Sequence, residues 1–272
     1  MNFYLNNLFF IYNIITYIVI LMAYNDDKYL IIILVIVLLL FLDSIYCNYK
    51  VDNLAMIEQD RDDIFKYLNY LTKFLDKHNI TYWIIGGTTL GSVRHNDIVP
   101  WDDDADIGIF EDDIEKLLTL NDELEKDGYE VIFYWKIYKF IKIGSEYPFI
   151  DIFCYKKIDD RYVMHRDDLN EAWPNEYYLE NELFPLKKYK FGKLYLNGPN
   201  YPINYLDRMY PKWRYIGKHI YDHKENKGTD ITIELEHSNP EHKLKPILYV
   251  NPEMNMQNEF NLYHNKKIIT IE

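Results

Sequence analysis

The sequence predicts an α+β fold, with a mixed β-sheet flanked by helices, and one or two transmembrane segments at the N-terminus. Three observations lead to this prediction. Tyr82–Ile85 is a short apolar run that ends at Gly86-Gly87, as a buried strand before a tight turn does. Residues 104–109 alternate polar and apolar side chains, which is typical of a half-buried strand. The first fifty residues contain two long apolar runs.

Composition narrows the class of protein. The chain has 272 residues and a net charge of −13, with 43 acidic against 30 basic side chains. This balance argues against a general nucleic-acid binder, which carries a basic surface. Two cysteines, Cys47 and Cys154, are too few for a disulfide framework or a Cys-rich zinc site. The chain has 27 tyrosines and abundant Asn and Ile. We interpret this composition as the result of drift in an AT-rich genome, such as that of a large DNA virus.

The N-terminal region, residues 1–50, is predicted to anchor the chain in a membrane. Leu8–Tyr24 is apolar apart from two polar side chains, and Tyr29–Leu42 is wholly apolar. The second run is short for a bilayer, which needs about twenty residues, but it becomes long enough when extended to Cys47. Two spans in a helical hairpin, one signal-anchor, or a pair of buried helices in a soluble protein all remain open. Flanking basic residues are too few to predict orientation.

The elements of the following region, residues 51–214, can be assigned from periodicity. Val51–His78 is amphipathic at helical spacing, so it predicts a helix that packs on the sheet. Another helix is predicted to begin after Gly86-Gly87, capped near Thr88. Residues 159–181 are polar and aromatic and are expected to form an insertion. The remaining predictions are a helix at 112–127, strands at 129–134, 137–143 and 149–155, a hairpin at 186–196, and a helix at 202–210. The extension, residues 215–272, shows little periodicity and has no predicted role.

Carboxylates mark the candidate site. Asp104, Asp106 and Gly108 share one face of the predicted strand, and Asp102 lies close to its start. Adjacent carboxylates repel each other, and a divalent cation such as Mg²⁺ or Mn²⁺ removes that conflict. An acidic loop that merely precedes a strand is the alternative. Asp151 favours the metal site, because a lone Asp within an apolar strand needs a partner.

Groups that bind phosphate are also predicted. The turn at Gly86, Gly87 and Thr88 opens a helix whose free N–H groups suit an anion. Arg94 would add a bidentate cation. Lys142 is expected to face the site from its strand, although an exposed lysine on an edge strand is an equal alternative.

These motifs resemble the nucleotidyltransferase fold, in which Gly-Gly follows a strand, Asp-x-Asp lies on the next strand, and a third acid lies on a later one. The stretch GGTTLGSVRHNDIVPWDDDADIGI, from Gly86 to Ile109, is similar to the signature of one branch, the LicD family. This family includes phosphocholine transferases and fukutin-related ribitol-phosphate transferases. A second stretch, Phe184 to Trp213, resembles the same family. The resemblance covers roughly residues 63–213.

The resemblance implies a metal-dependent transferase that moves a phospho-alcohol group from a CDP-linked donor to a glycan hydroxyl. Asp104 and Asp106 would hold the metal, and Asp102 would be a further ligand or a neighbouring support. Asp151 would be a third ligand or would accept the hydroxyl proton. Asp103 is expected to face away. A host secretory-pathway membrane would suit a glycan acceptor. Transfer of the nucleotide instead, or a non-catalytic membrane-anchored scaffold, are the alternatives.

Overall fold

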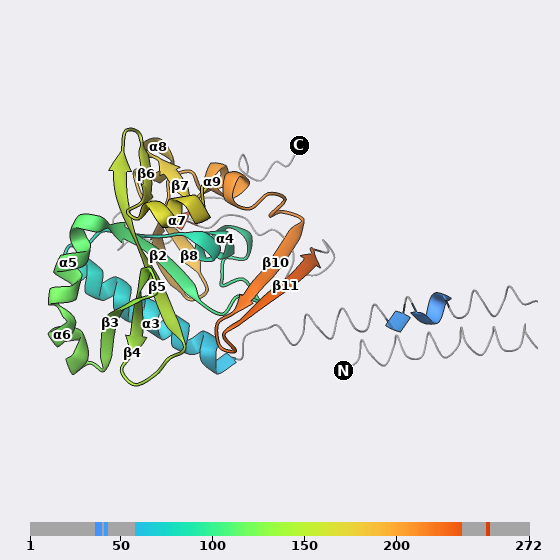
Figure 1. Ribbon diagram of the computed structural model, residues 1–272, viewed down its shortest axis with the longest axis horizontal. Coiled ribbons are helices and arrows are strands. Elements are labelled where there is room, and N and C mark those ends of the chain that lie inside the picture. The colour runs from blue at the N-terminus through green and yellow to red at the C-terminus, as the bar shows by residue number, and fades with distance from the viewer. Residues whose placement is uncertain (1–35, 40, 43–57, 236–248, 251–272) are drawn as a thin grey trace, which may run out of the picture. The chain divides into compact units, whose positions relative to one another are not determined.

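The computed structural model describes residues 36–39, 41–42, 58–235 and 249–250 of the chain (Figure 1). The chain divides into two compact units, 1–54 and 55–272. In the first unit, residues 36–39 are helical with exposed side chains. The rest of the predicted membrane segments, apart from residues 41–42, lies outside the described residues. Within the described ranges, no helix is both long and apolar enough to cross a membrane.

The second unit contains the predicted sheet and helices. Its helices are α3 (Glu58–Lys77), α4 (Gly86–Arg94), α5 (Glu111–Thr119), α6 (Asn121–Lys126), α7 (Asp167–Ala172), α8 (Glu180–Leu183) and α9 (Pro202–Met209). Its strands are β1 (Tyr82–Ile84), β2 (Ala105–Phe110), β3 (Tyr129–Tyr134), β4 (Ile137–Lys142), β5 (Phe149–Ile158), β6 (Arg161–Met164), β7 (Tyr177–Leu179), β8 (Lys187–Phe191), β9 (Leu194–Gly198), β10 (Ile216–Asp222), β11 (Lys227–Glu234) and β12 (Tyr249–Val250).

The main sheet is mixed, as predicted. Its central order is β1-β2-β5-β4-β3, and β6 and β7 extend it from the second half of β5. β2 and β5 run parallel, whereas the other pairs are antiparallel. The parallel pair brings the starts of β2 and β5 to the same edge of the sheet. That edge carries the aspartates singled out in the sequence.

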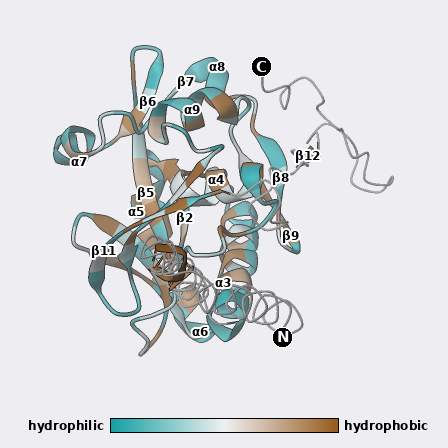
Figure 2. Ribbon diagram, turned by 90° about the vertical axis from the view of Figure 1, so that its right-hand side faces the viewer, coloured by the Kyte–Doolittle hydropathy of each residue, from teal (hydrophilic) through white to brown (hydrophobic). Residues whose placement is uncertain are grey.

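Helix α3 covers one face of this sheet. Its apolar positions recur at helical spacing, so Leu68, Leu71 and Leu75 are fully buried. Tyr67 and Tyr70 on the same helix pack against Tyr129 of β3 and Phe140 of β4. Figure 2 shows hydrophobic colouring on much of β5, whereas α7 and α8 are hydrophilic. The face of the sheet under α3 is therefore part of the core, and the opposite face carries Asp106, Asp151 and Lys139 as register partners.

The helix predicted over residues 112–127 is broken into α5 and α6. The break falls at Leu120, outside helical geometry. Asn121 explains it, because its side-chain amide exchanges two hydrogen bonds with the backbone of Val131, at 3.0 and 2.9 Å. These bonds tie the start of α6 to β3.

The predicted extension contains a hairpin, β10–β11, that packs on the rest of the second unit. The indole of Trp101 lies against Gly217 of β10, and its Nε1–H donates to the carbonyl of Lys218 at 3.1 Å. Lys224, in the turn of the hairpin, forms an ion pair with Asp60 of α3 at 2.7 Å. The sequence suggested little structure here because residues 216–234 alternate weakly. Contacts with Trp101 and α3 supply the missing stabilisation.

The packing of the hairpin can be tested with Gly217→Ala. A Cβ at this position would clash with the indole ring of Trp101. We expect a loss of about 1–3 kcal/mol in the free energy of unfolding, and faster amide hydrogen exchange in residues 216–234. Gly228→Ala, in open space on β11 of the same hairpin, is the matched control and should change stability by less than about 0.5 kcal/mol. Equal effects of the two variants would contradict this packing.

Candidate active site

Three carboxylates meet at the starts of β2 and β5. Asp106 and Asp151 are register partners on the two parallel strands, so their side chains point to the same face. Asp104, two residues before Asp106, joins them, and one oxygen of each carboxylate lies within 4.8 Å of the others. Asp104 and Asp151 are buried, with 8% and 6% of their surface exposed. We call these three residues the carboxylate centre.

Proximity and burial disfavour negative charge in the centre. Burial is the largest cause that raises the pKa of Asp106 well above its usual range, and the negative charges of Asp104, Asp151 and Asp102 raise it further. Burial also raises the pKa of Asp151 to about 6, although the ammonium of Lys139 opposes this shift. A divalent cation would relieve the conflict, since several carboxylate oxygens at this spacing suit a hard cation. The donor set therefore fits a metal ion.

The turn at Gly86-Gly87 lies directly against these carboxylates. Gly86 has a φ of +51°, and a Cβ there would come within 2.8 Å of Oδ2 of Asp106. A Cβ on Gly87 would come within 2.5 Å of Oδ2 of Asp102. The hydroxyl of Thr88 accepts a hydrogen bond from the backbone N–H of Asp106 at 2.7 Å. Both glycines are thus required for the close approach of acidic side chains, and Thr88 fixes α4 to β2. Phosphate binding by this turn remains a prediction.

A buried hydrogen-bond network that includes Tyr205, Tyr155 and Glu176 supports the glycine turn. The backbone N–H of Gly86 donates to the hydroxyl of Tyr205 at 2.9 Å. Tyr205 and Tyr155 both donate to the carboxylate of Glu176, at 2.6 and 2.7 Å. Burial raises the pKa of Glu176, and the two tyrosine hydroxyls oppose that shift. Glu176 was not singled out in the sequence, because it lies in a loop 70 residues after Asp106 and belongs to no recognisable motif.

The lysine of the site is Lys139 rather than Lys142. Its Nζ lies 2.9 Å from Oδ1 of Asp151, and the pair is buried. The same Nζ lies 3.0 Å from the ring centroid of Phe149. The prediction of Lys142 assumed that the isoleucines of β4 faced the core, but Ile137 and Ile141 share the face of Lys139. Lys142 lies on the opposite face and is exposed, so we correct that prediction.

Arg94 is buried, so its guanidinium is not exposed to bind phosphate from solvent. It is 1% exposed, its Nη1 donates to the carbonyl of Trp213 at 2.8 Å, and its Nε donates to His95 at 2.8 Å. Burial lowers the pKa of Arg94 to about 10, and the charge of Asp102 opposes that shift. Trp213 covers the guanidinium from 119 residues away, so spacing in the sequence could not identify this contact. The geometry favours a role for Arg94 in holding α4 and Asp102.

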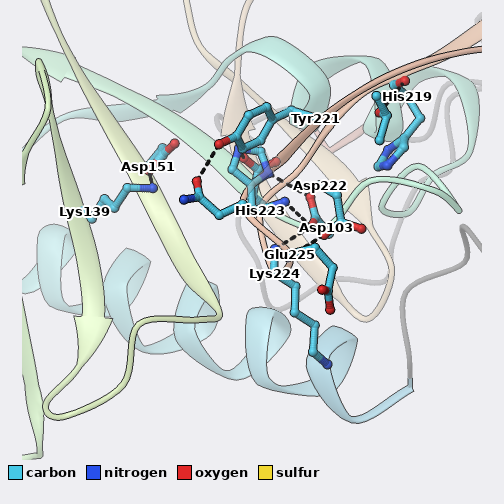
Figure 3. Close-up of polar contacts among 12 residues, drawn as sticks. Asp103, Lys139, Asp151, His219, Tyr221, Asp222, His223, Lys224 and Glu225 are labelled. Atoms are coloured by element: carbon cyan, nitrogen blue, oxygen red, sulfur yellow. Dashed lines mark hydrogen bonds and ion pairs between the residues drawn. The ribbon is translucent and has the colours of Figure 1, made fainter.

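The hairpin β10–β11 brings His223 to the centre (Figure 3). The backbone N–H and the Nδ1 of His223 lie 2.8 Å from the two carboxylate oxygens of Asp103, and the N–H of Lys224 donates to the same side chain at 3.3 Å. The Nε2 of His223 lies 3.3 Å from Asp104. Asp103 therefore points toward the hairpin, and this contact holds the segment that carries Asp104.

Asp103 and Asp104 favour a positive charge on His223. Burial alone would lower its pKa, but the hydrogen bond with Asp103 and the charges of Asp104, Asp103 and Asp151 raise it to about 9. His219 lies four residues before His223 in the sequence. The strand shifts register between His219 and Tyr221, and Figure 3 shows the two imidazoles apart. Spacing in the sequence could not identify Asp103, 120 residues away, as the partner.

These features define a class of protein. A glycine turn after one strand, paired aspartates on the next and a third aspartate on its parallel neighbour form an acidic centre of the nucleotidyltransferase type. Residues 79–201 match the family described as "LicD/FKTN/FKRP, nucleotidyltransferase domain". This part of the chain is therefore similar to the nucleotidyltransferase domain of the LicD family.

Relatives support this similarity over different lengths. An uncharacterized protein of Rickettsia typhi is 38% identical over 164 residues, which is 60% of this chain and 50% of that protein. The chain thus spans about half the length of this relative. Human ribitol 5-phosphate transferase FKRP is 44% identical over 45 residues, covering 16% of this chain and 9% of FKRP. The lipopolysaccharide cholinephosphotransferase LicD of Haemophilus influenzae is 33% identical over 53 residues, or 20% of each chain.

Among solved structures, the lincosamide antibiotic adenylyltransferase LnuA overlaps with 50% of this chain and 79% of its own. Its identity is 17% and its TM-score is 0.34.

The contact of His223 with Asp103 and Asp104 predicts a pH dependence. Because the folded-state pKa is about 9, above the ordinary 6.5, the stabilisation is fully present below pH 6.5 and is lost as pH rises through 9. In metal-free buffer, the free energy of unfolding from denaturant titrations should fall over this interval. His223→Gln should make the fall smaller. Equal slopes in the two proteins would contradict a charged His223.

Proposed function

We propose that this domain transfers a phospho-alcohol group from a CDP-linked donor to a glycan hydroxyl. The observation that carries the proposal is the carboxylate centre, built against the Gly86-Gly87 turn within a region similar to the LicD-family domain. The printed names of two relatives, a ribitol 5-phosphate transferase and a cholinephosphotransferase, support this class of reaction. Phosphocholine, ribitol phosphate and glycerol phosphate are the candidate groups.

The reaction exchanges one phosphorus–oxygen bond for another. The acceptor hydroxyl oxygen forms a bond to the distal phosphorus of the donor, and the bond from that phosphorus to the bridging oxygen breaks. CMP leaves with the electron pair. A divalent cation, Mg²⁺ or Mn²⁺, held by Asp104 and Asp106 would stabilise the charge that develops on the phosphate oxygens.

The chain's own groups have distinct proposed roles. Asp151 accepts the hydroxyl proton, a role compatible with its pKa of about 6, and Lys139 holds its carboxylate in place. The turn from Gly86 to Thr88 lies beside the centre and would receive phosphate through the backbone N–H groups of Gly87 and Thr88, since that of Gly86 donates to Tyr205. Asp102, whose carboxylate lies against Gly87, supports the centre or extends it as a further ligand.

We also propose that residues 1–50 attach the protein to a membrane, as their apolar sequence indicates. This would place the domain near membrane-bound glycoconjugates of a secretory compartment. Release of the full-length protein from membranes by alkaline carbonate alone would contradict this proposal.

Transfer is tested by supplying CDP-choline, CDP-ribitol and CDP-glycerol, each labelled in the alcohol, with Mg²⁺ and a mixed glycan acceptor. We expect label in the glycan and an equal amount of CMP. Asp104→Asn should lower the rate by about two to four decades, since several kcal/mol of transition-state stabilisation is lost. Asp112→Asn, an exposed acid in the first turn of α5, is the control and should retain the rate.

Two results would replace this proposal with another function. Release of pyrophosphate from a nucleoside triphosphate, with nucleotide in the product, would establish nucleotidyl transfer. Absence of both reactions in a protein that binds neither Mg²⁺ nor CMP would favour a non-catalytic scaffold.

A further inference from the structure

An exposed aromatic surface lies beside the carboxylate centre. It consists of Tyr134, Trp135, Phe153 and Trp173, and we call it the aromatic surface. Three of the five tryptophans in the chain are at most 4% exposed, whereas Trp135 is 60% and Trp173 is 37% exposed. Tyr134 is 53% exposed. Exposed aromatic side chains grouped in this way mark binding surfaces more often than isolated ones do.

The aromatic surface is continuous with the centre. Phe153 lies two residues after Asp151 on the same face of β5, so their Cα atoms are about 7 Å apart. The ring of Trp173 lies 6.4 Å from that of Phe153, and the ring of Trp135 lies 6.3 Å from that of Trp173. On the neighbouring strand, the Nζ of Lys139 lies 5.2 Å from the ring of Tyr134. A molecule on these rings would therefore reach Asp151.

The backbone holds these rings in place. Trp135 begins a two-residue turn between β3 and β4 with a φ of +56°, where Asn or Gly is the less strained choice. Trp173 is fixed by its own loop, because its carbonyl accepts a hydrogen bond from the N–H of Glu176 at 3.0 Å. Glu176 is in turn anchored by Tyr155 and Tyr205. The loop that carries Trp173 is thus tied to the network under the glycine turn.

Polar groups border the aromatic surface. Arg166 donates two hydrogen bonds to Asp168, both at 3.0 Å, and Lys136 pairs with the same carboxylate at 3.1 Å. The Nζ of Lys136 lies 4.7 Å from the ring of Trp135. The aromatic faces offer apolar contact, and the paired charges offer hydrogen-bond donors and acceptors without a large net charge. This combination matches a neutral ring that has C–H groups on its faces and hydroxyls on its edge.

We propose that the aromatic surface binds a sugar ring of the acceptor glycan. This inference rests on the proposed function and adds the location of the acceptor. The sheet order β1-β2-β5-β4-β3 places the glycine turn, after β1, on one side of Asp151, and Tyr134, at the end of β3, on the other. Attacking and leaving oxygens lie roughly in line across the transferred phosphorus. With the nucleotide on the side of the glycine turn, the acceptor occupies the side of Tyr134 and Trp135.

The binding experiment requires no turnover. Acrylamide quenching of tryptophan fluorescence reports chiefly on Trp135 and Trp173, because the other three tryptophans are buried. The full-length protein is titrated separately with mannotriose, maltotriose, cellotriose, chitotriose and CMP. At least one trisaccharide should protect the protein from quenching, and Trp135→Phe and Trp173→Ala should each weaken its binding about tenfold or more. Tyr201→Ala, which removes an aromatic side chain 51% exposed outside this surface, should leave trisaccharide binding unchanged.

A kinetic experiment separates the acceptor from the donor. In the transfer assay, Trp173→Ala should raise the KM for the glycan at least tenfold more than the KM for the CDP-linked donor. Trisaccharide binding with no transfer from any donor would support the surface while contradicting the proposed function. Protection by CMP but by none of the trisaccharides, or equal effects on the two KM values, would overturn the inference and assign the surface to the nucleotide base.

Discussion

Repulsion among buried carboxylates is the constraint on which the site depends. Asp106 and Asp151 are forced together by the parallel pairing of β2 and β5, and Asp104 follows because it lies two residues before Asp106. No arrangement of the same strands in the same register separates Asp106 from Asp151. Burial and the repulsion between these carboxylates both oppose their ionisation. A bound cation would reduce this electrostatic repulsion.

The surroundings of the centre can be understood as responses to that repulsion. Glycines at positions 86 and 87 allow two carboxylates to approach the backbone, where side chains would collide with them. Lys139 offsets the charge of Asp151, and His223 lies between Asp103 and Asp104. The hairpin that supplies His223 lies outside residues 79–201, the part that matches the family. The site is thus assembled by that part together with a later segment of the chain.

Local patterns predicted the parts of this structure that depend on local physics. The buried run before Gly86, the alternation through Asp104 and Asp106, and the apolar positions of α3 all led to the strands and helix observed. Patterns were ambiguous where both faces of a strand carry apolar residues, and this is why Lys142 was chosen instead of Lys139. The break at Leu120 depended on a tertiary contact between Asn121 and β3. His223 contacts Asp103, which lies 120 residues earlier, and Glu176 accepts a hydrogen bond from Tyr205, which lies 29 residues later. Spacing in the sequence gives no signal for either contact.

The central claim is that a divalent cation replaces protons in the carboxylate centre. Calorimetric titration of the metal-free protein with Mg²⁺, in buffers of different ionisation enthalpy, measures the protons released on binding. Because Asp151 has a pKa of about 6 and Asp106 a higher value than usual, binding at pH 6 should release protons, and Asp106→Asn should reduce that release. Binding at pH 6 without proton release, or identical release in Asp106→Asn, would contradict the account.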